Sequence, residues 1–147
     1  MATTQTRSVS ELEQPGDWLG RGVCRLRTAG GPHAPERVRN WLQATARSLP
    51  AELESNLMLL TCELVNNSVV HGHVGERQVI EVELRATEAG LRAQVTDPGP
   101  GFAPAGRTRE MDEPGGWGLV LVERLAAAWG VERDEGMRVW FELAVAA

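Results

Sequence analysis

Two polar side chains stand at positions where a predicted helix should be buried. An apolar stripe with spacings of four, three and four residues is formed by Leu53, Leu57, Leu60 and Leu64. The same rhythm continues to Asn67 and His71, and Glu63 lies about 60° to one side at about 100° of turn per residue. A buried amide without a partner costs on the order of 1–3 kcal/mol, so Asn67 must find hydrogen bonds or a ligand. The alternative is a satisfied structural amide beside a packed histidine.

This helix is expected to run from about Ala51 to His71. Pro50 can begin it, and Gly72 is a suitable residue for a left-handed cap at its end. Asn66 faces away from the buried stripe. The carboxylate, the buried amide and the imidazole therefore belong to the last turns of one helix.

An acidic residue continues the buried face of a predicted strand. Apolar and charged residues alternate over 80–86, and a hairpin turn at 87–90 leads to a second strand over 91–95. Asp97 shares the parity of the buried residues in that second strand. A buried carboxylate is costly unless it accepts specific hydrogen bonds. The alternative is that Asp97 merely caps the turn at residues 98–99.

A glycine-rich segment precedes another predicted helix. Residues 98–116 contain Gly, Pro, Arg and acidic residues without a period, which is typical of a lid. The run Gly-Gly-Trp-Gly at 115–118 then begins a helix that is expected to close at Trp129-Gly130. Backbone N–H groups at such a helix start favour an anion or a phosphate.

Three further elements complete the prediction. An edge strand is expected within residues 18–27, a helix over 35–49, and a last strand over 138–145. Residues 1–16 lack an apolar period and are predicted to form a flexible tail. Residues 17–147 are then expected to form a single domain.

The composition excludes several classes of protein. All 15 basic residues are Arg, which excludes a Walker A lysine, the strand lysine of ordinary protein kinases and a Schiff-base lysine. The net charge of −5 argues against direct nucleic-acid binding. No apolar run is long enough for a membrane span, and Cys24 and Cys62 lack metal-type spacing. A cytoplasmic protein without membrane association and with reduced cysteines is expected.

Three motifs stand in one order along the chain. They are Glu63-x-x-x-Asn67-x-x-x-His71, Asp97-x-Gly99-x-Gly101 and Gly116-x-Gly118-Leu119. This order resembles the N, G1 and G2 boxes of the Bergerat-fold ATPases, a superfamily that includes histidine kinases and gyrase B. Segments 128–131 and 136–143 look specifically like the small actinobacterial members related to anti-sigma-factor serine kinases. The resemblance covers residues 34–145.

The resemblance implies roles for the matching residues. Asn67 corresponds to the Mg²⁺ ligand between the metal and the ATP phosphates, and Glu63 to the carboxylate that orients or deprotonates the attacking hydroxyl or water. Asp97 corresponds to the acceptor of the adenine amino group, while His71 either contacts phosphate or packs. The other implied nucleotide-binding positions are Gly99, Gly101, Arg107, Gly116, Trp117, Gly118 and Leu119.

Independent chemistry agrees with the metal assignment. A tryptophan and two arginines, however, leave the match to the family incomplete. Mg²⁺ prefers oxygen ligands, keeps several waters and is usually bound together with phosphates, so one amide oxygen from Asn67 is a reasonable protein contribution. Trp117 is a bulky occupant of its position. Arg107 and Arg109 could reach phosphate, but the alternative for both is simple solvation.

The resemblance implies an α/β (α+β) two-layer sandwich, with a mixed, mostly antiparallel sheet and helices on one face. It implies a Mg²⁺–ATP-dependent serine kinase that acts on an anti-anti-sigma (antagonist) protein, with a sigma factor as a further partner and a homodimer as a frequent state. One alternative is a non-catalytic, nucleotide-gated module that sequesters a sigma factor or similar partner. Another is a nucleotide-binding fold without a competent site.

Overall fold

The computed structural model describes residues 22–88, 90–99, 117–133 and 136–144. The tail predicted for residues 1–16, the lid and its arginines therefore lie outside the described residues. In chain order the elements are β1 (Val23–Ala29), α2 (Ala34–Thr45), α3 (Ala51–Val70), β2 (Val79–Ala86), β3 (Gly90–Asp97), α5 (Trp117–Leu125), β4 (Ala128–Arg133) and β5 (Met137–Ala144).

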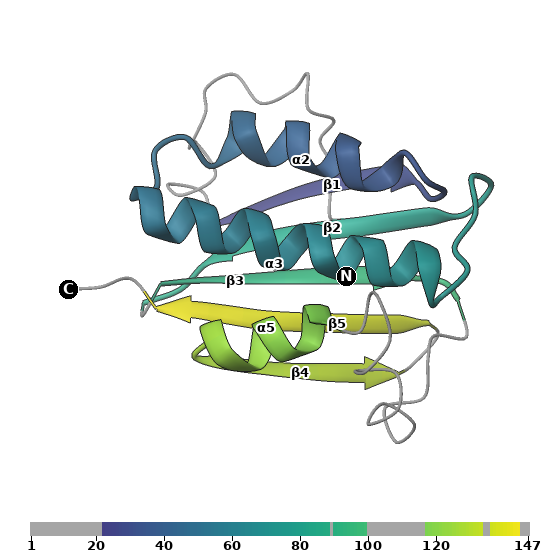
Figure 1. Ribbon diagram of the computed structural model, residues 1–147. Helices are drawn as coiled ribbons and strands as arrows, with labels where there is room; N and C mark the ends of the chain where they lie inside the picture. Colours follow the sequence, from purple (N-terminus) through teal and green to yellow (C-terminus); the bar gives the residue numbers. More distant parts are fainter. Residues whose placement is uncertain (1–21, 89, 100–116, 134–135, 145–147) are drawn as a thin grey trace, which may run out of the picture.

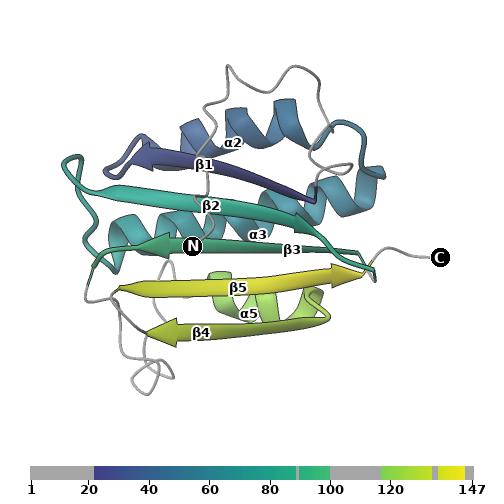
Figure 2. The same cartoon turned by 180° about the vertical axis from the view of Figure 1, so that it is seen from behind.

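The described chain forms two layers, a five-stranded sheet and a helix layer. The strand order is β1-β2-β3-β5-β4. Figure 1 shows α2, α3 and α5 in front of one face of the sheet, and Figure 2 shows the other face from behind, with no described helix across it. The core lies between the layers and includes Trp41, Leu57, Ile80 and Phe141, all at most 2% exposed. The predicted two-layer α+β sandwich is confirmed.

The leucine stripe of α3 is buried as predicted. Leu57 and Leu60 are fully buried, and Leu53 and Leu64 are at most 7% exposed. Each buried leucine contributes about 1.5–3 kcal/mol relative to exposure. This packing fixes the rotation of α3 about its axis, so the polar residue that follows in the stripe, Asn67, is also carried toward the sheet.

The sheet differs from the expectation of mixed pairing. All four described strand pairings are antiparallel. Strand β4, which follows α5, runs in the same direction as β3. It lies at the edge of the sheet, however, and not beside β3. Strand β5 fills the gap and runs antiparallel to both neighbours. The mixed sheet was implied by the resemblance, whereas the described strands pair only antiparallel, because β5 separates β3 from β4, which runs in the same direction.

The expected helix end at Trp129-Gly130 is wrong. Helix α5 ends at Leu125, and Ala128–Arg133 is strand β4, in which Trp129 pairs with Phe141. The alanine run before Trp129 favours a helix locally, but pairing with β5 prevails. Gly130 is no cap. A Cβ there would come within 2.7 Å of the Trp140 Nε1 atom, so glycine makes room for the indole.

The outer face of the sheet is not uniformly solvated. Glu83 was expected to face solvent opposite the apolar side of β2, yet it is only 7% exposed. Its carboxylate accepts from Arg25 Nε at 2.6 Å and pairs with Arg85 at 3.1 Å. Two cations thus compensate a shielded anion, as burial of a charge requires. The edge-strand prediction is confirmed for β1, which supplies Arg25.

Candidate functional site

The C-terminal end of α3 brings together the first group of predicted site residues. Asn67 is 3% exposed. Its backbone carbonyl accepts the N–H of His71 at 2.9 Å and the N–H of Gly72 at 3.0 Å, which closes the helix. His71 is the C-cap residue and is half-buried. The amide side chain of Asn67 is therefore held by a helix end whose backbone is fixed independently of it.

Gly72 has a different structural role from the predicted left-handed cap. The residue with positive φ is His73, at 54°. A Cβ on Gly72 would lie 2.6 Å from the Ser68 carbonyl oxygen, so glycine is required here by close approach. Histidine is among the residues that tolerate left-handed backbone better than most. In the turn after α3, the close contact therefore falls on Gly72 and the positive φ on the next residue, His73.

The side-chain oxygen of Asn67 is a buried acceptor without a partner among the described residues. Asn67 Oδ1 is shielded from solvent, and no described donor lies within hydrogen-bond distance of it. Such an orphaned acceptor costs about 1–3 kcal/mol unless something coordinates it. Among the described residues, no cluster of three or more His, Cys, Asp or Glu side chains could hold a metal alone. A single amide oxygen such as Asn67 Oδ1 suits a hard cation such as Mg²⁺, which would share its coordination shell with phosphates.

Asp97 lies at the end of β3 on the helix side of the sheet. It is 5% exposed, and its Oδ1 accepts the N–H of Gly99 at 2.9 Å. Burial raises the pKa of the Asp97 carboxyl above its ordinary value, while hydrogen bonds from the Ser68 hydroxyl and the Gly99 N–H act to lower it. The carboxylate therefore caps its turn, as one interpretation held, and keeps further acceptor capacity for a ligand.

The two ends of the site are in direct contact. A Cβ on Gly99 would lie 3.0 Å from the Gly72 carbonyl oxygen and 3.2 Å from Asp97 Oδ1. The turn after β3 thus packs against the turn after α3. Ser68, 5% exposed, directly follows Asn67 on α3 and was not among the predicted site residues. It shares a second buried stripe of α3 with Thr61 and Val65. A polar residue on that stripe was the feature of the sequence that could have indicated its burial.

The remaining predicted residues are only partly placed. Glu63 is half-buried on α3, one turn before Asn67. Leu119 is 6% exposed in the core, so its side chain packs against the apolar interior. Helix α5 begins at Trp117 and includes Gly118. Gly101, Arg107 and Gly116 lie outside the described residues. The nucleotide contacts expected of these positions stay predictions.

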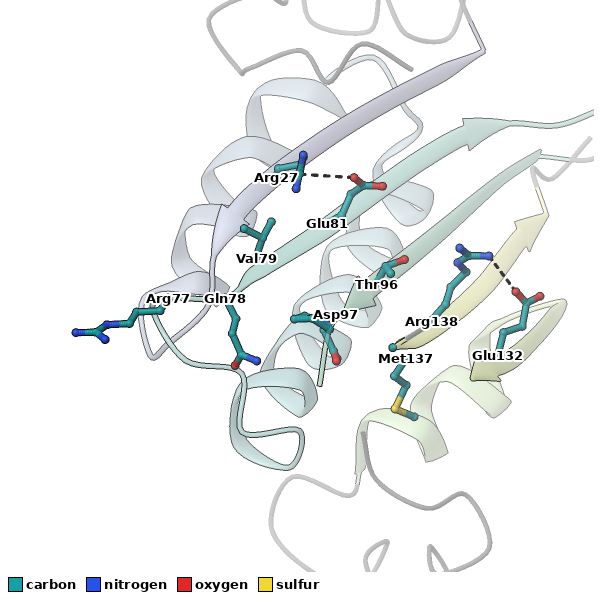
Figure 3. Close-up of a pocket in the computed structure, with 12 residues that line it drawn as sticks. Arg27, Arg77, Gln78, Val79, Glu81, Thr96, Asp97, Glu132, Met137 and Arg138 are labelled. Atoms are coloured by element: carbon teal, nitrogen blue, oxygen red, sulfur yellow. Dashed lines mark hydrogen bonds and ion pairs between the residues drawn. The ribbon is translucent and has the colours of Figure 1, made fainter. Parts of the chain in front are cut away.

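A hollow of about 630 Å³ is lined in part by Asp97 and Pro98. Figure 3 shows Thr96 between longer side chains from the neighbouring strands, with Arg27 facing Glu81 at 3.9 Å and Arg138 facing Glu132 at 3.1 Å. Thr96 and its strand partners have the parity opposite to Asp97, so the floor of this hollow belongs to the outer face of the sheet. Two ion pairs thus flank this floor, and Asp97 lies at its edge.

Comparison with known proteins agrees with this geometry. The family model described as "Histidine kinase-like ATPase domain" matches residues 31–143. Among solved structures, the histidine kinase domain of the Erythrobacter litoralis EL346 blue-light activated histidine kinase is similar, with a TM-score of 0.52 and 23% identity. The match covers 65% of this chain and 46% of that chain, so it spans less than half of that domain's length. No curated protein sequence matches.

The chain belongs to the histidine kinase-like ATPase domain family, because the family model covers most of its length. It is accordingly an ATP-binding domain. The likeness to the Erythrobacter protein shows the fold alone at this level of identity. Among the described helices, none is long and apolar enough to cross a membrane.

Replacing Asn67 with Ala tests whether its side-chain oxygen contributes to Mg²⁺-dependent ATP binding. We expect Mg²⁺-dependent ATP affinity to fall roughly 10- to 100-fold, the range found even for outer-shell partners of bound metals. The free energy of unfolding of the nucleotide-free protein should hold or rise, because an unpaired buried acceptor is removed. Isothermal titration and urea denaturation measure the two quantities. Asn66→Ala, one position along the same helix, is the matched control, and equal losses in both variants would contradict the assignment.

Proposed function

We propose that this protein is a Mg²⁺-ATP-dependent regulatory kinase of the anti-sigma type, which phosphorylates a serine on an antagonist protein. The observation that carries the proposal is the position of Glu63 relative to Asn67 on α3. A titratable carboxylate lies one helical turn before a buried amide oxygen that has no described donor. The family supplies ATP binding, and Glu63 supplies a group that can accept a proton.

Each residue has a separate task in the proposed transfer. Asp97 would accept from the adenine amino group, and Asn67 Oδ1 would help to hold the cation that accompanies the phosphates. Bound Mg²⁺ would neutralise negative charge on the phosphates. Glu63 takes the proton of the attacking serine hydroxyl as its oxygen bonds to the γ-phosphorus, and the bond to the bridging oxygen of the leaving ADP breaks. Phosphoserine, ADP and a protonated Glu63 result.

A second candidate function keeps nucleotide binding without transfer. A glutamate on this helix face can also hold a water or a metal-bound water without acting as a base. The protein would then be a nucleotide-gated module that captures a sigma factor or a similar regulatory partner. The two functions predict the same nucleotide affinity and differ in whether the partner acquires phosphate.

The deciding experiment uses labelled ATP and candidate antagonist proteins from the same genome. Under the kinase proposal, the label appears on a partner serine and depends on Mg²⁺. Partner binding that depends on nucleotide but leaves the partner unlabelled would support the sequestering module instead. Mass spectrometry of the partner identifies the phosphorylated residue.

Nucleotide binding itself should be visible as stabilisation. When the ATP concentration is a hundredfold above its dissociation constant and Mg²⁺ is in excess, linkage predicts that the free energy of unfolding rises by about 2.7 kcal/mol. Thermal melts of protein purified free of nucleotide, recorded over an ATP series, measure it. A melting temperature that stays constant up to saturating ATP and Mg²⁺ would contradict the proposed function at its first step. GTP serves as the control for the base.

A further inference from the structure

We propose that Gly136 is a positioning residue for recognition of the base, because it supports the backbone of Asp97 and so sets where the Asp97 carboxylate lies. The inference rests on the proposed function, which assigns Asp97 to the adenine amino group. It adds a residue from outside the three sequence motifs. Gly136 directly precedes Met137, which is the strand partner of Asp97 in β5.

The backbone of Gly136 lies against the backbone of the turn after β3. A Cβ on Gly136 would overlap with the Asp97 carbonyl oxygen, and it would lie 3.2 Å from the Pro98 Cα atom. It would also lie 3.3 Å from the Asp97 carbonyl carbon. Among the described glycines, positive φ occurs at Gly22 and Gly31 and not at Gly136. Glycine is therefore required at position 136 by the close approach of two backbone segments and not by its own conformation.

The peptide between Asp97 and Pro98 has little freedom to move away from Gly136. The proline ring fixes φ at its own position and restricts the backbone of the residue before it. The same turn also packs against the end of α3, where a Cβ on Gly99 would lie 3.0 Å from the Gly72 carbonyl oxygen. Backbone contacts from two separate segments therefore fix the point from which the Asp97 side chain extends.

A methyl group at position 136 should displace the Asp97 carboxylate without removing it. The atoms that the methyl group would meet belong to the backbone, so no side-chain rotation can relieve the overlap. A backbone shift of about 1 Å moves an acceptor out of range of a fixed donor, because N–H···O bonds are normally at most about 3.2 Å long. Asn67, which is assigned to the cation, lies on α3, whose end is closed by its own backbone hydrogen bonds. Recognition of the amino group should therefore suffer more than binding of the triphosphate.

The test compares ATP with purine-riboside triphosphate, which carries hydrogen in place of the 6-amino group. Titration calorimetry with Mg²⁺ measures both dissociation constants for the full chain. The parent should prefer ATP by about tenfold or more, as one hydrogen bond to a charged group predicts. In Gly136→Ala this preference should nearly vanish, while the affinity for the analogue stays within about twofold of the parental value, as independence of the two ends of the site predicts.

Gly130→Ala is the matched control, because Gly130 lies in β4 and an added Cβ would come within 2.7 Å of the Trp140 indole instead of the Asp97 backbone. It should keep the parental preference even where it lowers the free energy of unfolding. If Gly136→Ala weakens both nucleotides equally or keeps the parental ratio, or if the parent has no preference, the inference is overturned while nucleotide binding stands. A parent that binds neither nucleotide overturns the proposed function itself.

A measurement on the parent decides the case if Gly136→Ala does not fold. Backbone-amide NMR spectra of the two nucleotide complexes should differ at Gly136, because engagement of the carboxylate is transmitted through the contact with the Asp97 backbone. The amide of Gly130, which packs against Trp140, should give the same signal in both complexes. Identical Gly136 signals with ATP and with the analogue would overturn the inference.

Discussion

Glu63→Gln is expected to lower phosphoryl transfer to the partner by about 10²- to 10⁴-fold, the range for losing a positioned general base. Glutamine nearly keeps the size and hydrogen-bonding shape of the side chain but removes its charge and its proton affinity. ATP affinity should therefore stay close to the parental value. Single-turnover transfer from labelled ATP measures the chemical step separately from nucleotide binding.

The Glu63→Gln result separates the two candidate functions when it is combined with a control on the same helix. Glu52→Gln changes an exposed glutamate in the first turn of α3, far from Asn67 along the helix, and should transfer phosphate at the parental rate. A Glu63→Gln protein that also transfers at the parental rate would remove Glu63 from the catalytic role. If the parent transfers nothing while both variants still capture the partner, the sequestering module is the better description.

Asp97→Asn is expected to weaken ATP binding by about 1.5–3 kcal/mol, the net contribution of a hydrogen bond to a charged group. The amide can keep the contact to the Gly99 N–H through its oxygen, but its NH₂ group presents donors where the adenine amino group also donates. The fold should persist, since the neighbouring strand pairing is unchanged. ATP titration of the variant measures the loss, and parental affinity would leave Asp97 as a turn cap only.

The same substitution has an opposite expected effect on the nucleotide-free protein. Burial raises the pKa of Asp97 in the folded state, so the folded protein takes up a proton more readily than the unfolded chain. Ionised Asp97 therefore disfavours folding above its raised pKa, and this cost is relieved as the pH falls through that pKa. Asp97→Asn should match or exceed the parent in unfolding free energy at pH 7. The difference should shrink toward pH 4 in urea denaturation.

The elements that were predicted well share one property. In α3, β2, β3 and β5 the buried face follows a regular period, and burial against the opposite layer selects the same residues that the pattern does. Asn67 and Asp97 were identified because each continues an apolar face with a polar side chain. Both are buried in the structure, as the periodicity predicts.

The misses arise where a neighbouring segment decides the outcome. Trp129 lies in a strand because β5 offers it a partner, and Glu83 is shielded because Arg25 comes from another strand. Gly72 is required by an approaching carbonyl rather than by its own φ. None of these contacts leaves a local pattern in the sequence.

The insertion of β5 between β3 and β4 also sets the order in which the sheet can be completed. Gly90 pairs with Ala144 and Asp97 with Met137, so β3, which carries Asp97, acquires its second neighbour only from residues made much later on the ribosome. Pairings this distant in sequence close slowly. Until they close, β3 presents an unpaired edge on which another chain can add a strand. A newly made chain is therefore open to misassembly at the strand that carries Asp97.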